Sequence, residues 1–322
     1  MKKHVLLPIF SLLLFAGVAS AQKINPADLN TLKRKEDTLK ALAKAVIVDS
    51  LPEGRMRSDS LFVRTLVRTL QVKNSFYYPF DSVLGISKIY APDSAFRIFS
   101  WSISFDDYYA RQRAAIQLKT ADGSLQLIPL RDYSEFTDKA VDSIRTKNNW
   151  IGAVYYNIIK TENKGKPYYT LFGFDDYSVR SNKKWIEVLS FDEKRQPVFG
   201  ADFSFAADSV KRPVQKRFYI EYKKEASTFV NWDPDLNLII VDHLISETDE
   251  PDKPYTFVPD GDSEGFAWKG GKWIHIDKVF DFKLQDGQAP VPDPVRDAKG
   301  TNNEIKLQQQ SDKNRKVKTG GT

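Results

Sequence analysis

The chain has no cysteine, only three histidines and only two methionines among its 322 residues. Without cysteine there can be no disulfide framework, no thiol nucleophile and no thiolate metal site. Such a chain must fold by burying apolar side chains, and at roughly 300 residues about three quarters of the unfolded surface is buried. The 21 Phe and 14 Tyr residues supply material for a large core.

The scarcity of histidine limits the available chemistry. His4 lies in the leader described below, so His243 and His275 remain, and they fall on different predicted strands. A Ser-His-Asp triad would need one of them as its base. Both stand beside isoleucine- and valine-rich runs, where a single histidine is more often structural than catalytic. We therefore expect no metal site and no cofactor.

The first 21 residues have the pattern of a removable export signal. Two lysines precede an apolar run over residues 5–18, and Ala19-Ser20-Ala21 supplies the small residues that a signal peptidase needs. The run is shorter than the roughly 20 residues that span a bilayer. Cleavage before Gln22 would leave an exported chain, periplasmic or extracellular, with no transmembrane segment and no cysteine for a lipid anchor.

The net charge of +6 falls to +4 once Lys2 and Lys3 are removed with the signal. This excess is spread along the sequence, whereas nucleic-acid binding predicts a concentrated basic stripe. We therefore expect no nucleic-acid partner.

Residues 22–74 read as a helical hairpin. Residues 22–52 form the first helix and its exit, with Asn25 as N-cap, Pro26 at the first helical position, and Pro52 and Gly54 as terminators. A second helix is expected at about 57–73, capped by Ser58 and apolar along one face.

Residues 75–284 read as an antiparallel β domain. Short runs of aromatic and β-branched residues alternate with turn signals, which predicts about a dozen strands between residues 85 and 283. The polar stretch 132–149 is expected to hold a short helix or a long loop. The turn signals are Asp122-Gly123, Asn163-Lys164-Gly165, Asp233-Pro234-Asp235 and Gly270-Gly271.

A Trp-Ile pair begins three of these predicted strands, at Trp150, Trp185 and Trp273, with spacings of 35 and 88 residues. The second spacing is near twice a propeller blade of about 40–50 residues. We therefore expect a mainly β fold with an N-terminal helical hairpin and a large, propeller-like antiparallel meander; a β-sandwich or a barrel is the alternative. Residues 285–322 are rich in Pro, Gln, Asn, Lys and Gly and predict a disordered tail.

Carboxylates and aromatic residues supply weak candidates for a binding site. Adjacent aspartates on a strand point to opposite faces, so a doublet cannot by itself form a catalytic pair. Tryptophans can stack on sugar rings, but in β-rich proteins most fill the core. The candidates are Trp232, His243, Asp175, Asp176 and His275.

Four segments resemble a set found in uncharacterised exported proteins of Bacteroidetes. The likeness covers most of residues 55–283 and excludes the tail. It implies export and a single folded domain, and it implies no activity. The segments are YYPFDS at 77–82, PDSAFRIFSW at 92–101, KPYYTLFGF at 166–174 and PVFG at 197–200.

Three functions remain open from the sequence. The favoured one is a non-enzymatic binding or envelope-assembly protein whose partner is an envelope protein or a glycan. The second is a carboxylate-dependent hydrolase acting on polysaccharide, which needs two carboxyl groups about 5–10 Å apart across a cleft. The third is a carrier of a small apolar ligand inside a barrel.

Overall fold

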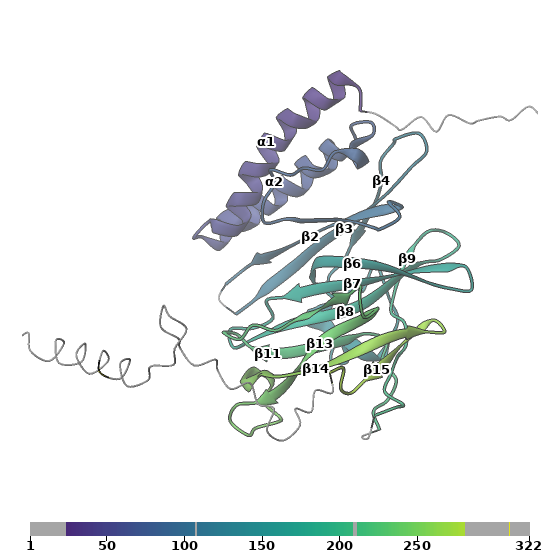
Figure 1. Ribbon diagram of the computed structural model, residues 1–322. Helices are drawn as coiled ribbons and strands as arrows, with labels where there is room; N and C mark the ends of the chain where they lie inside the picture. The colour runs from purple at the N-terminus through teal and green to yellow at the C-terminus, as the bar shows by residue number, and fades with distance from the viewer. Residues whose placement is uncertain (1–23, 107, 209–210, 281–308, 310–322) are drawn as a thin grey trace, which may run out of the picture. The chain divides into compact units, whose positions relative to one another are not determined.

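The computed structural model describes residues 24–106, 108–208, 211–280 and 309 (Figure 1). The predicted signal, with Ala19, Ala21 and Gln22, and nearly all of the predicted tail lie outside the described residues. The chain divides into two units, Met1–Val279 and Phe280–Thr322. The helices and strands named below all belong to the first unit.

The N-terminal hairpin consists of α1 (Pro26–Val48) and α2 (Pro52–Leu70). The Asn25 side chain accepts from the Asp28 backbone N–H at 2.8 Å, so the predicted cap is confirmed. The predicted start of the second helix was wrong, because α2 begins at Pro52 rather than near Ser58. Proline suits a first helical position, since its φ is already helical and its missing N–H would have no partner there.

The strands form three sheets, and nearly all neighbouring strands are antiparallel. The first sheet has the order β1-β2-β3-β4. A short 3₁₀ turn, η1 (Ser75–Tyr77), leads from α2 toward it. Its strands are β1 (Ser87–Tyr90), β2 (Phe96–Ser104), β3 (Ala110–Leu118) and β4 (Gln126–Leu130).

The second sheet has the order β5-β9-β8-β7-β6. Strand β9 pairs with residues 189–191 of β8, and β11 pairs with residues 181–186 of β8. The 3₁₀ turns η2 (Ser134–Phe136) and η3 (Ala140–Asp142) precede it, in the polar stretch predicted to be a short helix or a long loop. Its strands are β5 (Arg145–Thr146), β6 (Val154–Asn163), β7 (Lys166–Asp175), β8 (Ser181–Phe191), β9 (Pro197–Phe199) and β11 (Phe218–Lys223).

The third sheet has the order β10-β15-β14-β13-β12, with β10 and β15 parallel. The 3₁₀ turn η4 (Pro254–Thr256) precedes β14. Its strands are β10 (Phe203–Ser204), β12 (Val230–Asp233), β13 (Leu238–Ser246), β14 (Phe257–Lys269) and β15 (Lys272–Ile276).

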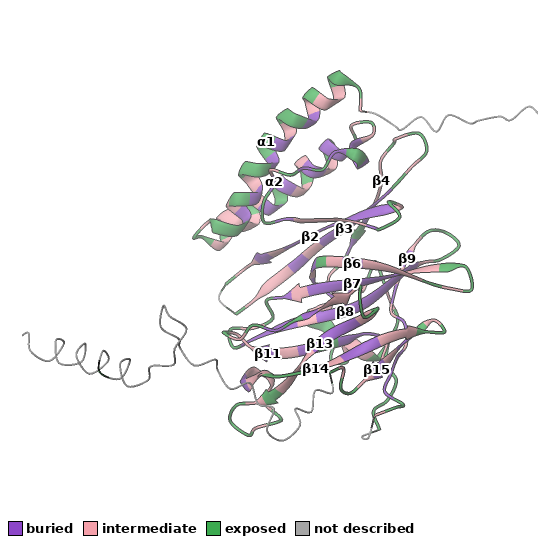
Figure 2. Ribbon diagram, in the orientation of Figure 1, coloured by how far each residue is buried: buried purple, intermediate pink, exposed green. Residues whose placement is uncertain are grey.

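The hairpin and the three sheets are stacked in layers, and apolar side chains fill each space between layers. On β2, Phe99 and Trp101 pack toward the helices, while Phe96 and Ile98 pack toward the second sheet. On β8, Trp185 and Leu189 pack toward the first sheet, whereas Ile186 and Val188 pack toward the third. These strands are buried on both faces, as the purple segments of Figure 2 show.

A mainly β fold with two N-terminal helices and antiparallel sheets is therefore confirmed, and the stacking fits the sandwich alternative rather than a propeller. The three Trp-Ile pairs are not equivalent: Trp150 precedes β6, Trp185 lies inside β8, and Trp273 lies on β15 next to β10. All three tryptophans are core residues. Their spacing therefore does not mark a blade repeat.

Candidate functional site

Two adjoining hollows lie between the first and second sheets, beside the beginning of β3 and the end of β7. Their volumes are about 380 and 490 Å³. We call them together the Asp175 cleft, because Asp175 lines both. The other residues that line both hollows are Ser134, Thr137, Asp138 and Tyr177.

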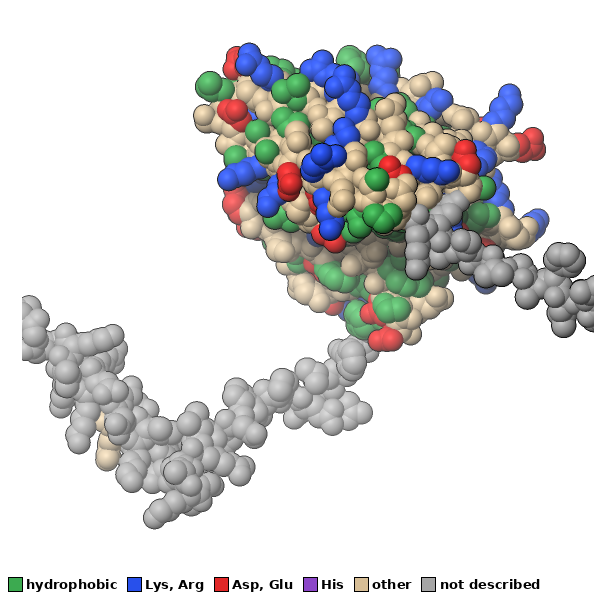
Figure 3. All heavy atoms as spheres, turned by 90° about the horizontal axis from the view of Figure 1, so that it is seen from above, with side chains coloured by type: hydrophobic (Ala, Val, Ile, Leu, Met, Phe, Trp, Pro, Cys, Tyr) green, Lys and Arg blue, Asp and Glu red, His purple; other side chains and the backbone are tan. Residues whose placement is uncertain are grey.

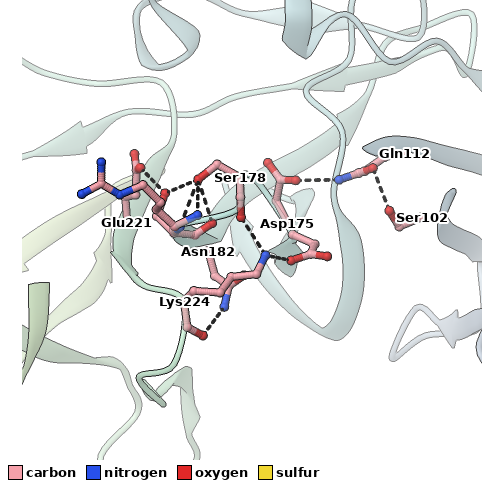
Figure 4. Close-up of polar contacts among 10 residues, drawn as sticks. Ser102, Gln112, Asp175, Ser178, Asn182, Glu221 and Lys224 are labelled. Atoms are coloured by element: carbon pink, nitrogen blue, oxygen red, sulfur yellow. Dashed lines mark hydrogen bonds and ion pairs between the residues drawn. The ribbon is translucent and has the colours of Figure 1, made fainter. Parts of the chain in front are cut away.

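Gln112 joins the two sheets at the floor of this cleft. Its side-chain amide on β3 donates to Asp175 Oδ1 at the end of β7, at 2.6 Å, and its Oε1 accepts from the Ser102 hydroxyl at 3.3 Å (Figure 4). The Gln112 backbone N–H donates to Asp132 Oδ2 at 3.0 Å. One glutamine thus fixes two carboxyl groups from different parts of the chain.

Asp175 is 7 % exposed. Burial raises its pKa to about 7, and the negative charge of Asp132 adds to this, while Lys183 acts in the opposite direction. Burial dominates because an ionised carboxylate loses its hydration in such a place. A carboxyl group with a pKa near neutrality can release or take up a proton at physiological pH.

Asp132 also orders the wall of the cleft. Its Oδ1 accepts from the Ser134 backbone N–H at 3.0 Å and from the Ser134 hydroxyl at 2.7 Å. That hydroxyl in turn accepts from the Gly152 N–H at 2.8 Å. The η2 turn is therefore attached to both the first sheet and the segment before β6, and it holds Thr137 and Asp138 at the cleft.

Aromatic rings form another wall. The Lys183 ammonium lies 3.2 Å from the centre of the Tyr177 ring and 5.0 Å from that of Tyr219. The indole Nε1 of Trp185 is buried and has no hydrogen-bond partner among the described residues, yet it lies near enough to Asp175 to favour its charged form. Tyr177 is 48 % and Tyr219 is 36 % exposed, so both rings are accessible, that of Tyr177 more so.

The cleft has an acidic balance. Five of its lining residues are Asp or Glu and three are Lys or Arg. An acidic, aromatic-lined cleft favours ligands that donate hydrogen bonds and present apolar faces. The acidic residues are Asp132, Glu135, Asp138, Asp142 and Asp175, and the basic ones are Arg111, Lys139 and Lys183.

Of the sequence candidates, Asp175 and Asp176 lie in different surroundings, because β7 ends at Asp175 and Asp176 belongs to the loop that follows. Asp175 lies in the cleft, whereas Asp176 is exposed and pairs with Lys224. Trp232, on β12, packs against Trp273 with 6.2 Å between ring centres, as part of the core between the second and third sheets.

The two histidines lie on the third sheet and not in the cleft. The side chain of His243 is 45 % exposed, and its Nδ1 is 2.8 Å from Asp260 Oδ2. The side chain of His275 is fully buried between Asp208, 2.8 Å from Nδ1, and Glu264, 2.9 Å from Nε2. Burial alone would lower the pKa of His275, but these hydrogen bonds outweigh it and raise the pKa.

Sequence reasoning missed Gln112, Asp132 and Tyr177. Gln112 lies within a strand and carried no local signal, and Asp132 looked like an ordinary polar residue at the start of a loop. In the part of the chain that the structure describes, no group of three or more His, Asp and Glu side chains is arranged to hold a metal ion. No described helix has the length and apolar character needed to span a bilayer.

Comparison with protein-family models, with curated proteins and with solved structures yields no match to this chain.

Proposed function

We propose that the protein is exported and acts as a non-enzymatic binding protein, and that the Asp175 cleft holds a sugar chain of an envelope glycan. The observation that carries the proposal is the placement of Asp175, a buried carboxyl group that opens onto both hollows beside the exposed ring of Tyr177. Carboxyl oxygens accept hydrogen bonds from hydroxyl groups, and aromatic rings pack against the C–H faces of sugars.

The extent and the rigidity of the cleft support this function. Two adjoining hollows offer room for more than one sugar ring, and small-molecule sites commonly reach 300–1,000 Å³. The hydrogen bonds of Gln112 and Ser134 fix the carboxyl groups before a ligand arrives. A preorganised site loses less entropy on binding.

Binding to immobilised glycans tests the proposal. We expect the wild-type chain to retain a defined set of glycans and the Tyr177→Ala variant to lose at least tenfold in affinity. Tyr108→Ala is the matched control, because Tyr108 is 78 % exposed and does not line either hollow. Failure to bind any glycan, or equal losses in both variants, would refute this function.

A second candidate, a carboxylate-dependent hydrolase, has one specific observation in its favour. Asp175 has a pKa of about 7 beside the negatively charged Asp132, and both are held by Gln112. A protonated acid beside an ionised carboxylate is the division of roles that glycoside hydrolysis uses. The carrier of a small apolar ligand receives no such support, since the described strands form open, stacked sheets.

Release of reducing ends from the bound glycans separates the two candidates. A hydrolase should release them, should lose this activity in Asp175→Asn and should keep it in Asp176→Asn, whose residue is exposed outside the cleft. Retention of glycans without release supports the binding protein. Mass spectrometry of the protein recovered from culture is expected to find Gln22 at its N-terminus if it is exported as proposed.

A further inference from the structure

The charges of residues 24–280 are divided unequally between the hairpin and the sheets. Residues 24–73 hold ten Lys and Arg against six Asp and Glu, a net charge of +4. Residues 74–280 hold 27 against 30, a net charge of −3. The sequence indicated an even spread of charge, but the excess of positive charge is concentrated in the hairpin.

The positive charges of the hairpin lie on its solvent side. Figure 3 looks down on this face and shows Lys and Arg side chains in excess over acidic ones. Among the exposed residues of the hairpin, the acidic ones are Asp37 and Glu53. The exposed basic ones are Lys33, Arg34, Lys40, Lys44, Arg57, Arg64, Arg68 and Lys73.

The tip of the hairpin adds exposed apolar side chains. Val48 is 63 % and Leu51 is 64 % exposed, and Ile47 is 49 % exposed. Ile47 lies against Gly85, where a Cβ atom would come within 1.9 Å of its Cδ1. Leu84, the residue before that glycine, is 74 % exposed. We call Ile47, Val48, Leu51 and Leu84 the apolar tip.

Hydrogen bonds attach the turn of this tip to the rest of the fold. Arg55 donates through Nη1 to the Asp49 carbonyl at 2.7 Å and through Nε to the Ser104 carbonyl on β2, also at 2.7 Å. The Leu51 N–H donates to Asp49 Oδ1 at 3.0 Å. The turn between the helices is thus attached to the first sheet, and Val48 and Leu51 are kept in solvent.

We propose that the outer face of the hairpin docks on an anionic phospholipid bilayer, with the apolar tip entering the interface. This goes beyond the proposed glycan binding. Each Lys or Arg near a negatively charged bilayer adds to the electrostatic attraction. Apolar side chains next to such a basic face gain further free energy by leaving water at the headgroup boundary.

The apolar tip is what favours a bilayer over nucleic acid. Phosphodiester backbones attract Lys and Arg equally well, and this attraction needs no exposed apolar residues. The turn between the helices, together with Leu84, presents four of them next to the basic face, which matches a surface with both charge and an apolar interior. The acidic sheets on the other side would be repelled by the same bilayer and so set the orientation of docking.

Vesicle co-sedimentation tests the proposal with the full chain lacking its first 21 residues. We expect binding to vesicles of phosphatidylcholine mixed with phosphatidylglycerol, at least tenfold weaker binding to phosphatidylcholine alone, and further weakening as salt is added, since charges are screened over about 10 Å at 0.1 M. The triple variant Lys40→Glu/Lys44→Glu/Arg64→Glu should lose at least tenfold in affinity.

The matched control reverses the charge of three exposed lysines on the second and third sheets: Lys164→Glu/Lys269→Glu/Lys272→Glu. Lys164 lies in the turn between β6 and β7, and Lys269 and Lys272 are the strand residues that flank the turn between β14 and β15. It should bind as the wild type does. The variant Val48→Ser/Leu51→Ser should bind severalfold more weakly at unchanged charge, and unchanged thermal unfolding verifies that each variant is folded. Equal losses in both triple variants, no effect of the serine substitutions, or tighter binding to duplex DNA than to the vesicles would overturn the proposal.

Discussion

Arg217 and Glu187 form a buried ion pair, with 2.7 Å between Nε and Oε1 and with side chains 0 % and 3 % exposed. The second carboxylate oxygen of Glu187 accepts from the Tyr155 hydroxyl at 3.0 Å. Arg217 Nη1 donates to the Ala140 carbonyl and, at 3.0 Å, to the Ser143 carbonyl. Residues 140–142 line the Asp175 cleft. The pair therefore attaches one wall of the cleft to the middle of β8.

Replacing Arg217 with methionine should destabilise the fold by about 3–5 kcal/mol, because Glu187 would remain buried without its cationic partner. Urea unfolding measures the loss. Lys194→Met, at an exposed residue, is the control and should change stability by less than about 0.5 kcal/mol. The double variant Arg217→Met/Glu187→Leu should recover part of the loss, and a double variant less stable than the single one would contradict the explanation.

Asp175 should make the fold less stable as the pH rises. Its folded pKa of about 7 exceeds its ordinary value of 3.8, so the folded state holds the proton that the unfolded state has released between these values. The free energy of unfolding should therefore fall from about pH 4 to pH 7 by at most about 4 kcal/mol.

Asp175→Asn should remove this decline, because the amide keeps an acceptor for Gln112 and does not ionise. Urea unfolding at several pH values measures it, with Asp176→Asn as the control that keeps the slope of the wild type. An unchanged slope in Asp175→Asn would show that Asp175 ionises as readily in the fold as in the unfolded chain.

His275 should add a second pH dependence in a different range. Both ring nitrogens face carboxylates, and the folded pKa is raised above the ordinary value of 6.5. Its contribution is complete below about pH 6.5 and is lost as the pH rises through the folded pKa. His275→Gln should cost about 1–3 kcal/mol at pH 6 and less at higher pH.

Unfolding of His275→Gln at several pH values, compared with His243→Gln, tests this assignment. The side chain of His243 is 45 % exposed and bonds to one carboxylate, so its replacement should change stability by about 0.5 kcal/mol or less. A constant loss in His275→Gln across the range would mean that protonation of His275 does not stabilise the fold.

The local elements were predictable because their causes are local. Asn25 caps α1 through a residue three positions away. Asp122-Gly123 and Gly270-Gly271 do join antiparallel strands, since glycine adopts the positive φ values of 76° and 61–84° found there. Ser58 falsely predicts a cap because helix-capping residues also occur inside helices. The prediction places Pro52 at the end of the first helix, but Pro52 begins the second one.

The stacking and the cleft depend on contacts between distant residues. The run Leu171-Phe172-Gly173-Phe174 on β7 has no polar residue, and such a run indicates burial on both faces but does not say which layers cover it. Gln112 and Asp175 are 63 residues apart, and their hydrogen bond follows from the stacking of two sheets. The sequence drew attention to Asp175 only through its aspartate neighbour, which has a different role.

Turn glycines offer a test of how closely the chain is packed around β3 and β4. Gly123 has a φ of +76°, its carbonyl accepts from the Asn74 N–H at 2.9 Å, and a Cβ atom there would meet Asn74 Oδ1 at 2.0 Å. Gly165 has a φ of +75° with nothing within 4 Å. Gly165→Ala should cost about 1 kcal/mol from backbone strain, and Gly123→Ala should cost more. Equal losses of thermal stability would argue against close packing at Asn74.

Attachment of the hairpin to the first sheet can be tested on α2. Leu66 is 4 % exposed and belongs to the cluster that includes Leu39, Phe62 and Trp101. Leu66→Asp should destabilise the fold by about 3–5 kcal/mol, because it removes apolar contacts and buries a carboxyl group without a partner. Leu61→Asp, one and a half turns earlier on the same helix and 40 % exposed, should cost about 1 kcal/mol or less. Thermal unfolding of both variants measures the difference. If Leu66→Asp unfolded at the temperature of the wild type, the hairpin would be a separate element, and docking through its outer face could not orient the sheets.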